Sequence, residues 1–235
     1  MGSDKSKNRH EDNASVKLNR KIAKKQFSQP KSKQLHKAGT KVLPKILIIA
    51  DDEKSIILYL KGFNKENRVR NLEFSKEGGG LDQLSLAEKA KDKITDYDCI
   101  FCIFDQDASH KSDSHYKKYV AALSLLEACD NIEAITSIPC YEIWLLLHFK
   151  FTDKPCGNTE NKSICDKVIS ELKKCDGMQD YDKADKNIYQ KTGRLYLDNA
   201  IRHAELLEES NERGNTNNPS TNIHLLMEYL QIYSF

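Results

Sequence analysis

The chain has 235 residues, of which 39% are hydrophobic and 31% are charged, and its formal net charge is +2. This length suits one domain with an appendage, and the lack of an apolar run of about 18 residues excludes a transmembrane helix. The polar, charged N-terminus is not typical of a signal peptide. Seven cysteines, mostly within apolar runs, are typical of free thiols. We therefore expect a cytoplasmic protein without membrane contact.

The charge is unevenly distributed along the chain. Residues 16–45 contain ten Lys and Arg residues and no acid, whereas residues 46–235 contain 24 basic and 32 acidic residues. We predict that residues 1–42 form a basic, disordered arm. Such an arm either contacts nucleic-acid phosphates or only solubilises the protein. The candidate nucleic-acid contacts are Arg20, Lys21, Lys24, Lys25, Lys31 and Lys33.

Apolar runs and amphipathic segments alternate from residue 43 to about residue 150. Short apolar runs predict buried strands, and apolar residues at helical spacing predict helices. This alternation is typical of an α/β fold with a mostly parallel sheet flanked by helices. In chain order, we expect strand Ile46–Ala50, helix Glu53–Asn67, strand Val69–Ser75, helix Leu81–Ile94, strand Cys99–Phe104, helix Asp113–Cys129 and strand Ile132–Ser137.

The pattern changes after Pro139. Tyr141–Phe149 predicts a strongly apolar helix that holds the only tryptophan, Trp144. From about residue 160 the chain is predicted to be mainly helical, with a turn-rich interruption at Glu212–Thr221. We therefore divide residues 43–235 into an α/β core (43–150) and a helical C-terminal extension (151–235).

Acidic residues follow two of the predicted strands. Asp51, Asp52 and Glu53 follow the first strand, and Asp105 and Asp107 follow the strand at Cys99–Phe104. Because ligands of α/β sheets bind at the carboxyl ends of the strands, the two groups should meet at one edge. Convergent carboxylates need a cation, and oxygen ligands suit Mg²⁺ or Mn²⁺. The alternative is that these acids cap the following helices, as Asp52 is placed to do.

Two α/β families use acids in this way. In a phospho-receiver domain, Asp105 would accept the phosphoryl group, Thr136 or Ser137 would be the switch hydroxyl, and Lys154-Pro155 would supply the lysine. That interpretation leaves the second acid of Asp105-Gln-Asp107 unused. In the Toprim fold, the acid after the first strand acts in acid/base catalysis and the Asp-x-Asp pair holds metal.

Other motifs favour the second arrangement. Pro139-Cys-Tyr-Glu-Ile-Trp-Leu-Leu-Leu-His-Phe149 resembles the Asn-Pro-Cys-Phe-Glu-Leu-Trp-Leu-Leu-Leu-His-Phe stretch of the RloB family. Asn218-Pro-Ser-Thr-Asn-Ile-His224 resembles that family's final Asn-Pro-Ser-Thr-x-Val-His segment, and Phe104-Asp-Gln-Asp107 fits its Phe-Asp-x-Asp. The resemblance covers about residues 43–235.

This resemblance implies a Toprim-like fold and a metal-dependent nuclease effector of a bacterial antiphage (abortive infection) system. It also implies an AAA/ABC-type ATPase partner and cleavage of RNA, including tRNA, or of DNA. Asp51 would act in acid/base catalysis and would share the metal with Asp105 and Asp107. Self-association is a further expectation.

The chain departs from the family's usual Cys-Glu-Gly-x-x-Thr-Glu motif. Asp51 replaces the first Glu, which shortens its reach by one methylene, and Ile56 replaces the second. Glu53 is a candidate substitute catalytic acid. The alternative function is therefore a non-catalytic module that binds nucleic acid or docks on the ATPase through a degenerate site.

Several other residues are candidates for the site or for a separate one. Glu142 is a candidate third carboxylate, the alternative being a favourable first-turn acid of its helix. His148 has either a supporting role or a packing role. Cys99 and Cys102 lie three apart in a strand and should face opposite sides, so they cannot share a zinc ion. Gly78-Gly79-Gly80 lacks the Lys-Ser/Thr of a P-loop and is interpreted as a loop near the site.

Overall fold

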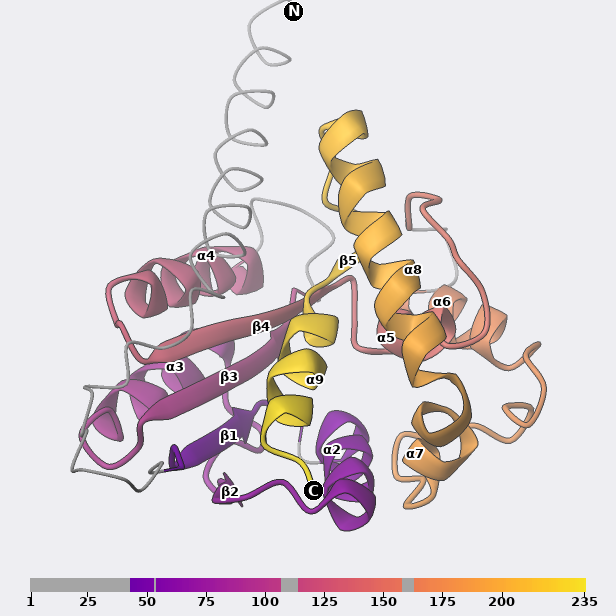
Figure 1. Ribbon diagram of the computed structural model, residues 1–235. Helices are drawn as coiled ribbons and strands as arrows, with labels where there is room; N and C mark the ends of the chain where they lie inside the picture. Colours follow the sequence, from indigo (N-terminus) through magenta and orange to yellow (C-terminus); the bar gives the residue numbers. More distant parts are fainter. Residues whose placement is uncertain (1–42, 53, 107–113, 158–162) are drawn as a thin grey trace, which may run out of the picture.

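The computed structural model describes residues 43–52, 54–106, 114–157 and 163–235, and the predicted arm lies outside these ranges. The strands are β1 (Ile46–Ala50), β2 (Leu72–Phe74), β3 (Cys99–Asp105), β4 (Ile132–Ile138) and β5 (Ser220–Thr221). The helices, shown in Figure 1, are α2 (Ser55–Asn67), α3 (Gln83–Asp92), α4 (Ser114–Glu127), α5 (Glu142–Leu147), α6 (Ile164–Leu172), α7 (Ile188–Lys191), α8 (Gly193–Gly214) and α9 (Ile223–Ile232).

The five strands form one sheet in the order β2-β1-β3-β4-β5. β1 pairs in parallel with β2 and β3, β3 pairs in parallel with β4, and β5 alone runs antiparallel, against the end of β4. All five residues of β1 are buried, as expected for a parallel strand covered on both faces. The predicted α/β class with a mostly parallel sheet is confirmed.

Alternating strand residues supply two cores, one on each face of the sheet. Ile46 and Ile48 belong to the core on the face covered by α2 and α9, whereas Leu47 and Ile49 belong to the core under α3 and α4 (Figure 1). Cys99 and Cys102 fall in different cores, which confirms that they face opposite sides. All seven cysteines are free thiols.

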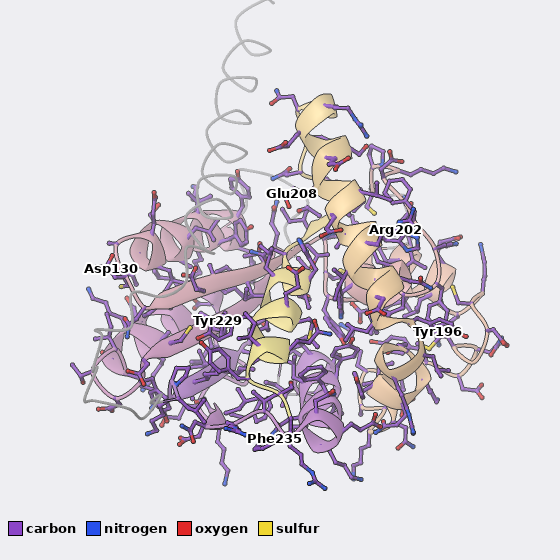
Figure 2. The ribbon with its side chains drawn as sticks, viewed as in Figure 1. Asp130, Tyr196, Arg202, Glu208, Tyr229 and Phe235 are labelled. Carbon is purple, nitrogen blue, oxygen red and sulfur yellow. The ribbon has the colours of Figure 1, made fainter. Side chains whose placement is uncertain are left out.

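The C-terminal part of the chain shares the core of the α2 face. Every residue of α5 is buried, and Trp144 is fully enclosed. Tyr229, labelled on α9 in Figure 2, packs edge-on against Phe101 of β3 with 5.0 Å between ring centroids. Helices α5 to α9 thus close one side of the sheet and the space beyond its carboxyl edge. No helix in the described parts of the chain is long and apolar enough to cross a membrane.

Candidate active site at the carboxyl edge of the sheet

Two of the predicted acids meet at the ends of neighbouring strands. Ala50 of β1 pairs with Ile103 of β3, so Asp51 follows directly beside the end of β3. The backbone N–H of Asp105 donates to Oδ2 of Asp51 at 3.4 Å, and the N–H of Asp51 donates to the carbonyl of Ile103 at 3.2 Å. The parallel register therefore brings together two aspartates that are 54 positions apart in the chain.

The loop after β4 orients the side chain of Asp105. Its Oδ2 accepts a hydrogen bond of 2.9 Å from the backbone N–H of Tyr141, at the entrance to α5. The side-chain amide of Gln83 donates to the Asp105 carbonyl at 3.1 Å. Together with the bond to Asp51, groups from three segments thus fix Asp105. A hydrogen bond to a carboxylate, such as the bond from Tyr141, is stronger than one between neutral groups.

The glycine loop after β2 lies against the end of β1, as predicted. The N–H of Gly80 donates to the Asp51 carbonyl at 3.2 Å. A Cβ atom added to Gly78 would come within 2.1 Å of the Ala50 carbonyl oxygen, so only glycine fits this close backbone approach. Through Gly80, the loop holds the backbone of Asp51 from the β2 side of β1, opposite the side that pairs with β3.

Asp52 caps the following helix. Its Oδ1 accepts from the backbone N–H of Lys54 at 2.7 Å, and its Oδ2 accepts from the N–H of Ser55 at 3.3 Å. These bonds satisfy amides at the start of α2 that have no partner within the helix. The capping interpretation is therefore correct for Asp52, whereas Asp51 faces the neighbouring strand.

Glu142 is buried and pairs with Lys183, a lysine that no sequence pattern marks as part of the site. The carboxylate is 1% exposed. Its Oε1 accepts from the Tyr181 hydroxyl at 3.1 Å and lies 3.5 Å from the ammonium of Lys183, and its Oε2 has no hydrogen-bond partner among the described residues. Burial opposes the charge of Lys183, but Glu142 and, more weakly, Asp105 and Asp52 raise its pKa above the ordinary value.

His148 lies in the aromatic core. Its Nδ1 bonds the Trp144 carbonyl at 2.9 Å, and its Nε2 bonds the Tyr59 hydroxyl at 2.9 Å. Because a carbonyl only accepts, Nδ1 carries the proton and Nε2 accepts from Tyr59. The side chain is fully buried, and neither ring nitrogen bonds a carboxylate. This arrangement supports the packing role rather than a supporting role in the site.

The stability of the protein should fall at mildly acidic pH because of His148. Burial lowers its pKa from 6.5 to about 4. Between these values the unfolded chain binds a proton that the folded chain excludes, so the free energy of unfolding decreases as the pH falls through this window. The expected loss from this side chain is about 1.4 kcal/mol per pH unit. Urea unfolding between pH 7 and pH 5 measures it, and His148→Gln should reduce the slope. An equal slope in the variant would contradict this assignment.

Several predicted site residues fall outside the described residues. These are Glu53, Asp107 and the six basic residues of the arm, Arg20, Lys21, Lys24, Lys25, Lys31 and Lys33. Their predicted roles stay predictions. The other predicted site residues are Asp51 and Asp105, which lie together, Glu142, which lies behind Lys183, and His148, which lies in the core.

The fit of a metal ion depends on Asp107. The described residues contain no group of three or more His, Cys, Asp or Glu side chains that could hold a metal ion. Asp51 and Asp105 supply two carboxylates of the kind that Mg²⁺ prefers. Mg²⁺ is commonly bound through one or two carboxylates, with waters or substrate phosphates completing its shell. The donor chemistry therefore fits, and Asp107 is the predicted further ligand.

The phospho-receiver interpretation fits the structure poorly. In the doubly wound order 2-1-3-4-5 of receivers the sheet is parallel, but β5 is antiparallel here. The hydroxyl of Ser137 is buried against that of Thr221 at 3.2 Å. Lys154 is exposed and forms no ion pair within the described parts of the chain. The lysine that pairs with Glu142 near this edge is Lys183 instead.

Comparison with known proteins gives a family and no closer relative. The family model described as RloB-like protein matches residues 46–230, which is most of the chain. No curated protein and no solved structure matches the sequence. The matched range includes both strand-end acids, Asp51 and Asp105, and the C-terminal helical part up to Leu230. The chain belongs to the RloB family.

Proposed function

We propose that this protein is the Toprim-like, metal-dependent nuclease effector of a bacterial antiphage system that acts by abortive infection. It cleaves phosphodiester bonds in RNA, with tRNA as one candidate, or in DNA. The observation that carries this proposal is the juxtaposition of Asp51 and Asp105 at the carboxyl ends of β1 and β3, in a chain of the RloB family.

The proposed chemistry divides the acids by role. A bound Mg²⁺ or Mn²⁺ ion supplies charge neutralisation at the scissile phosphate and lowers the pKa of a bound water. Asp105 and Asp107 would hold the ion, and Asp51 would contribute to its binding. Asp51 would also accept the proton of the water that attacks phosphorus, while the P–O bond to the leaving oxygen breaks and that oxygen takes up a proton. The bond from the Tyr141 N–H keeps the Asp105 carboxylate in place during these steps.

A non-catalytic binding module is the second candidate function. It is favoured by the replacement of the family's second glutamate with Ile56, whose side chain is 2% exposed within the core and offers no carboxylate. It is also favoured by the shorter reach of Asp51. In this case the protein would bind nucleic acid, or dock on its ATPase, and would not cleave nucleic acid.

Cleavage of a labelled RNA or DNA separates these two functions. The full chain, alone and with the ATPase encoded beside its gene, is incubated with Mg²⁺ or Mn²⁺ and in parallel with EDTA. Metal-dependent cleavage supports the nuclease. Tight binding of the nucleic acid without cleavage under every metal condition supports the binding module instead.

The ATPase partner rests on the family resemblance, and self-association is a separate expectation. We propose an AAA/ABC-type ATPase encoded nearby as the partner that activates or recruits the protein. Copurification of the two chains, and light scattering of this chain alone, measure the two associations. If the protein defended cells that lack the ATPase, the proposed ATPase partnership would be contradicted.

Deleting residues 1–42 should weaken binding to nucleic acid. The deletion removes basic residues that would each release a counterion on phosphate contact, so affinity for single-stranded RNA should fall more than about tenfold near 0.1 M salt. Fluorescence anisotropy measures this change. The matched variant replaces Arg20, Lys21, Lys24 and Lys25 with glutamine in the full chain. Unchanged affinity in both variants would assign the arm a solubilising role.

A further inference from the structure

The ion pair between Lys183 and Glu142 joins an exposed cation to a buried anion. The Lys183 side chain is 53% exposed, whereas the Glu142 side chain is 1% exposed. A buried carboxylate is costly unless a cation and hydrogen bonds compensate it. Lys183 and the Tyr181 hydroxyl provide both to Oε1. Glu142 thus pairs with the ammonium from within the protein, while the Lys183 side chain stays 53% exposed.

The backbone around Lys183 is tied to the edge of the sheet. The hydroxyl of Ser55, at the start of α2, donates to the Lys183 carbonyl at 3.3 Å. Tyr181, two residues earlier, reaches Glu142 at the start of α5. The segment therefore contacts the first turn of α2, which follows β1, and the first turn of α5, which follows β4. Its lysine has a defined position, unlike a lysine on a freely exposed loop.

Lys183 also lies within the electrostatic field of the strand-end acids. Asp105 and Asp52 contribute to the upward shift of its pKa, after the larger contribution of Glu142. The ammonium is therefore charged at neutral pH. A polyanion that approached these carboxylates without a nearby cation would be repelled, because like charges at a few ångströms cost free energy. A fixed ammonium at this edge offsets that repulsion.

We propose that Lys183 is a phosphate-binding residue of this site, whose ammonium donates to a non-bridging oxygen of a nucleic-acid phosphodiester while Glu142 holds it in place. This inference rests on the proposed function, because it names the group that contacts the substrate backbone there. An ammonium has three donors, so one can face Glu142 and two can face the phosphate. Glu142 is then a positioning residue that acts through Lys183, rather than a metal ligand.

Binding without cleavage tests the inference. The full chain is titrated into labelled single-stranded RNA, and into DNA of the same sequence, in EDTA between about 50 and about 200 mM salt. Lys183→Gln should bind roughly tenfold more weakly, and its log–log salt slope should be smaller by about 0.7, the value for one phosphate contact on a single strand. Lys183→Arg should keep the slope. The two probes show whether the contact is shared by RNA and DNA.

The control is Lys186→Gln, which changes an exposed lysine three positions away and should leave affinity and slope unchanged. Glu142→Gln should weaken binding in the wild-type background but not in the Lys183→Gln background, because it acts through that lysine. Wild-type affinity and slope in Lys183→Gln would overturn the inference, and so would a wild-type chain that binds neither probe. The proposed function has a separate test. It fails if the wild-type chain binds nucleic acid but does not cleave it in the presence of Mg²⁺ or Mn²⁺.

Discussion

Replacing Asp105 with asparagine is expected to reduce metal-dependent cleavage by at least about a hundredfold and to leave the fold intact. The amide oxygen can still accept the bond that the Tyr141 N–H donates at 2.9 Å, so the loop after β4 keeps its anchor. The negative charge that would hold the metal is lost, and one electrostatic contact of this kind is worth about 10²–10³ in rate. Removal of a like charge beside Asp51 should also keep or slightly raise the free energy of unfolding.

The matched control uses the opposite end of the same strand. Asp98 precedes β3, is exposed, and accepts from the backbone N–H of Lys45 at 2.8 Å. Asp98→Asn makes the same chemical change far from the carboxyl edge and should cleave like the wild type. Cleavage rates in Mg²⁺ and thermal unfolding in EDTA are measured for both variants. A wild-type cleavage rate in Asp105→Asn would remove this aspartate from the site.

Gly78→Ala is expected to destabilise the protein by about 1–3 kcal/mol and to lower cleavage with it. The added Cβ would lie 2.1 Å from the Ala50 oxygen and 3.0 Å from its carbonyl carbon. Both atoms belong to the backbone of β1, which cannot rotate away as a side chain does, so the loop must move. Because the same loop bonds the Asp51 carbonyl through Gly80, the movement should shift Asp51, and small displacements of catalytic groups cost much activity.

Urea unfolding and the cleavage assay measure the two effects of Gly78→Ala. Gly157→Ala is the control, since a Cβ there would meet nothing within 4 Å. It should leave both the free energy of unfolding and the cleavage rate near their wild-type values. If Gly78→Ala is as stable as this control, the close approach of the glycine loop to β1 is wrong.

The parallel sheet and the meeting of the two acids could be predicted from local patterns. The run Ile46–Ala50 has the length and composition of a buried parallel strand, and its predicted bounds match β1. The carboxyl ends of parallel strands share one edge, so the encounter of Asp51 and Asp105 follows from the fold class alone. Period-two alternation likewise placed Cys99 and Cys102 on opposite faces.

Contacts between distant parts of the chain were not predictable in this way. Lys183 reaches the site through a bond to Ser55 that spans 128 positions, and nothing in its neighbouring sequence marks it as different from other exposed lysines. β5 was predicted only as part of a turn-rich segment. It exists because Ser220 and Thr221 pair with the end of β4, where the Asn222 side chain also bonds the Thr136 N–H at 2.6 Å and the Ala134 carbonyl at 3.0 Å.

Direct observation of a bound metal would test the central proposal most sharply. Crystals of the full chain are soaked in Mn²⁺, and anomalous diffraction locates the ion. The proposal predicts a peak within about 2.5 Å of carboxylate oxygens of Asp51 and Asp105, with Asp107 completing the ligand set, and its loss in Asp105→Asn. An empty carboxyl edge at a Mn²⁺ concentration that supports cleavage, or a peak that persists in Asp105→Asn, would contradict it.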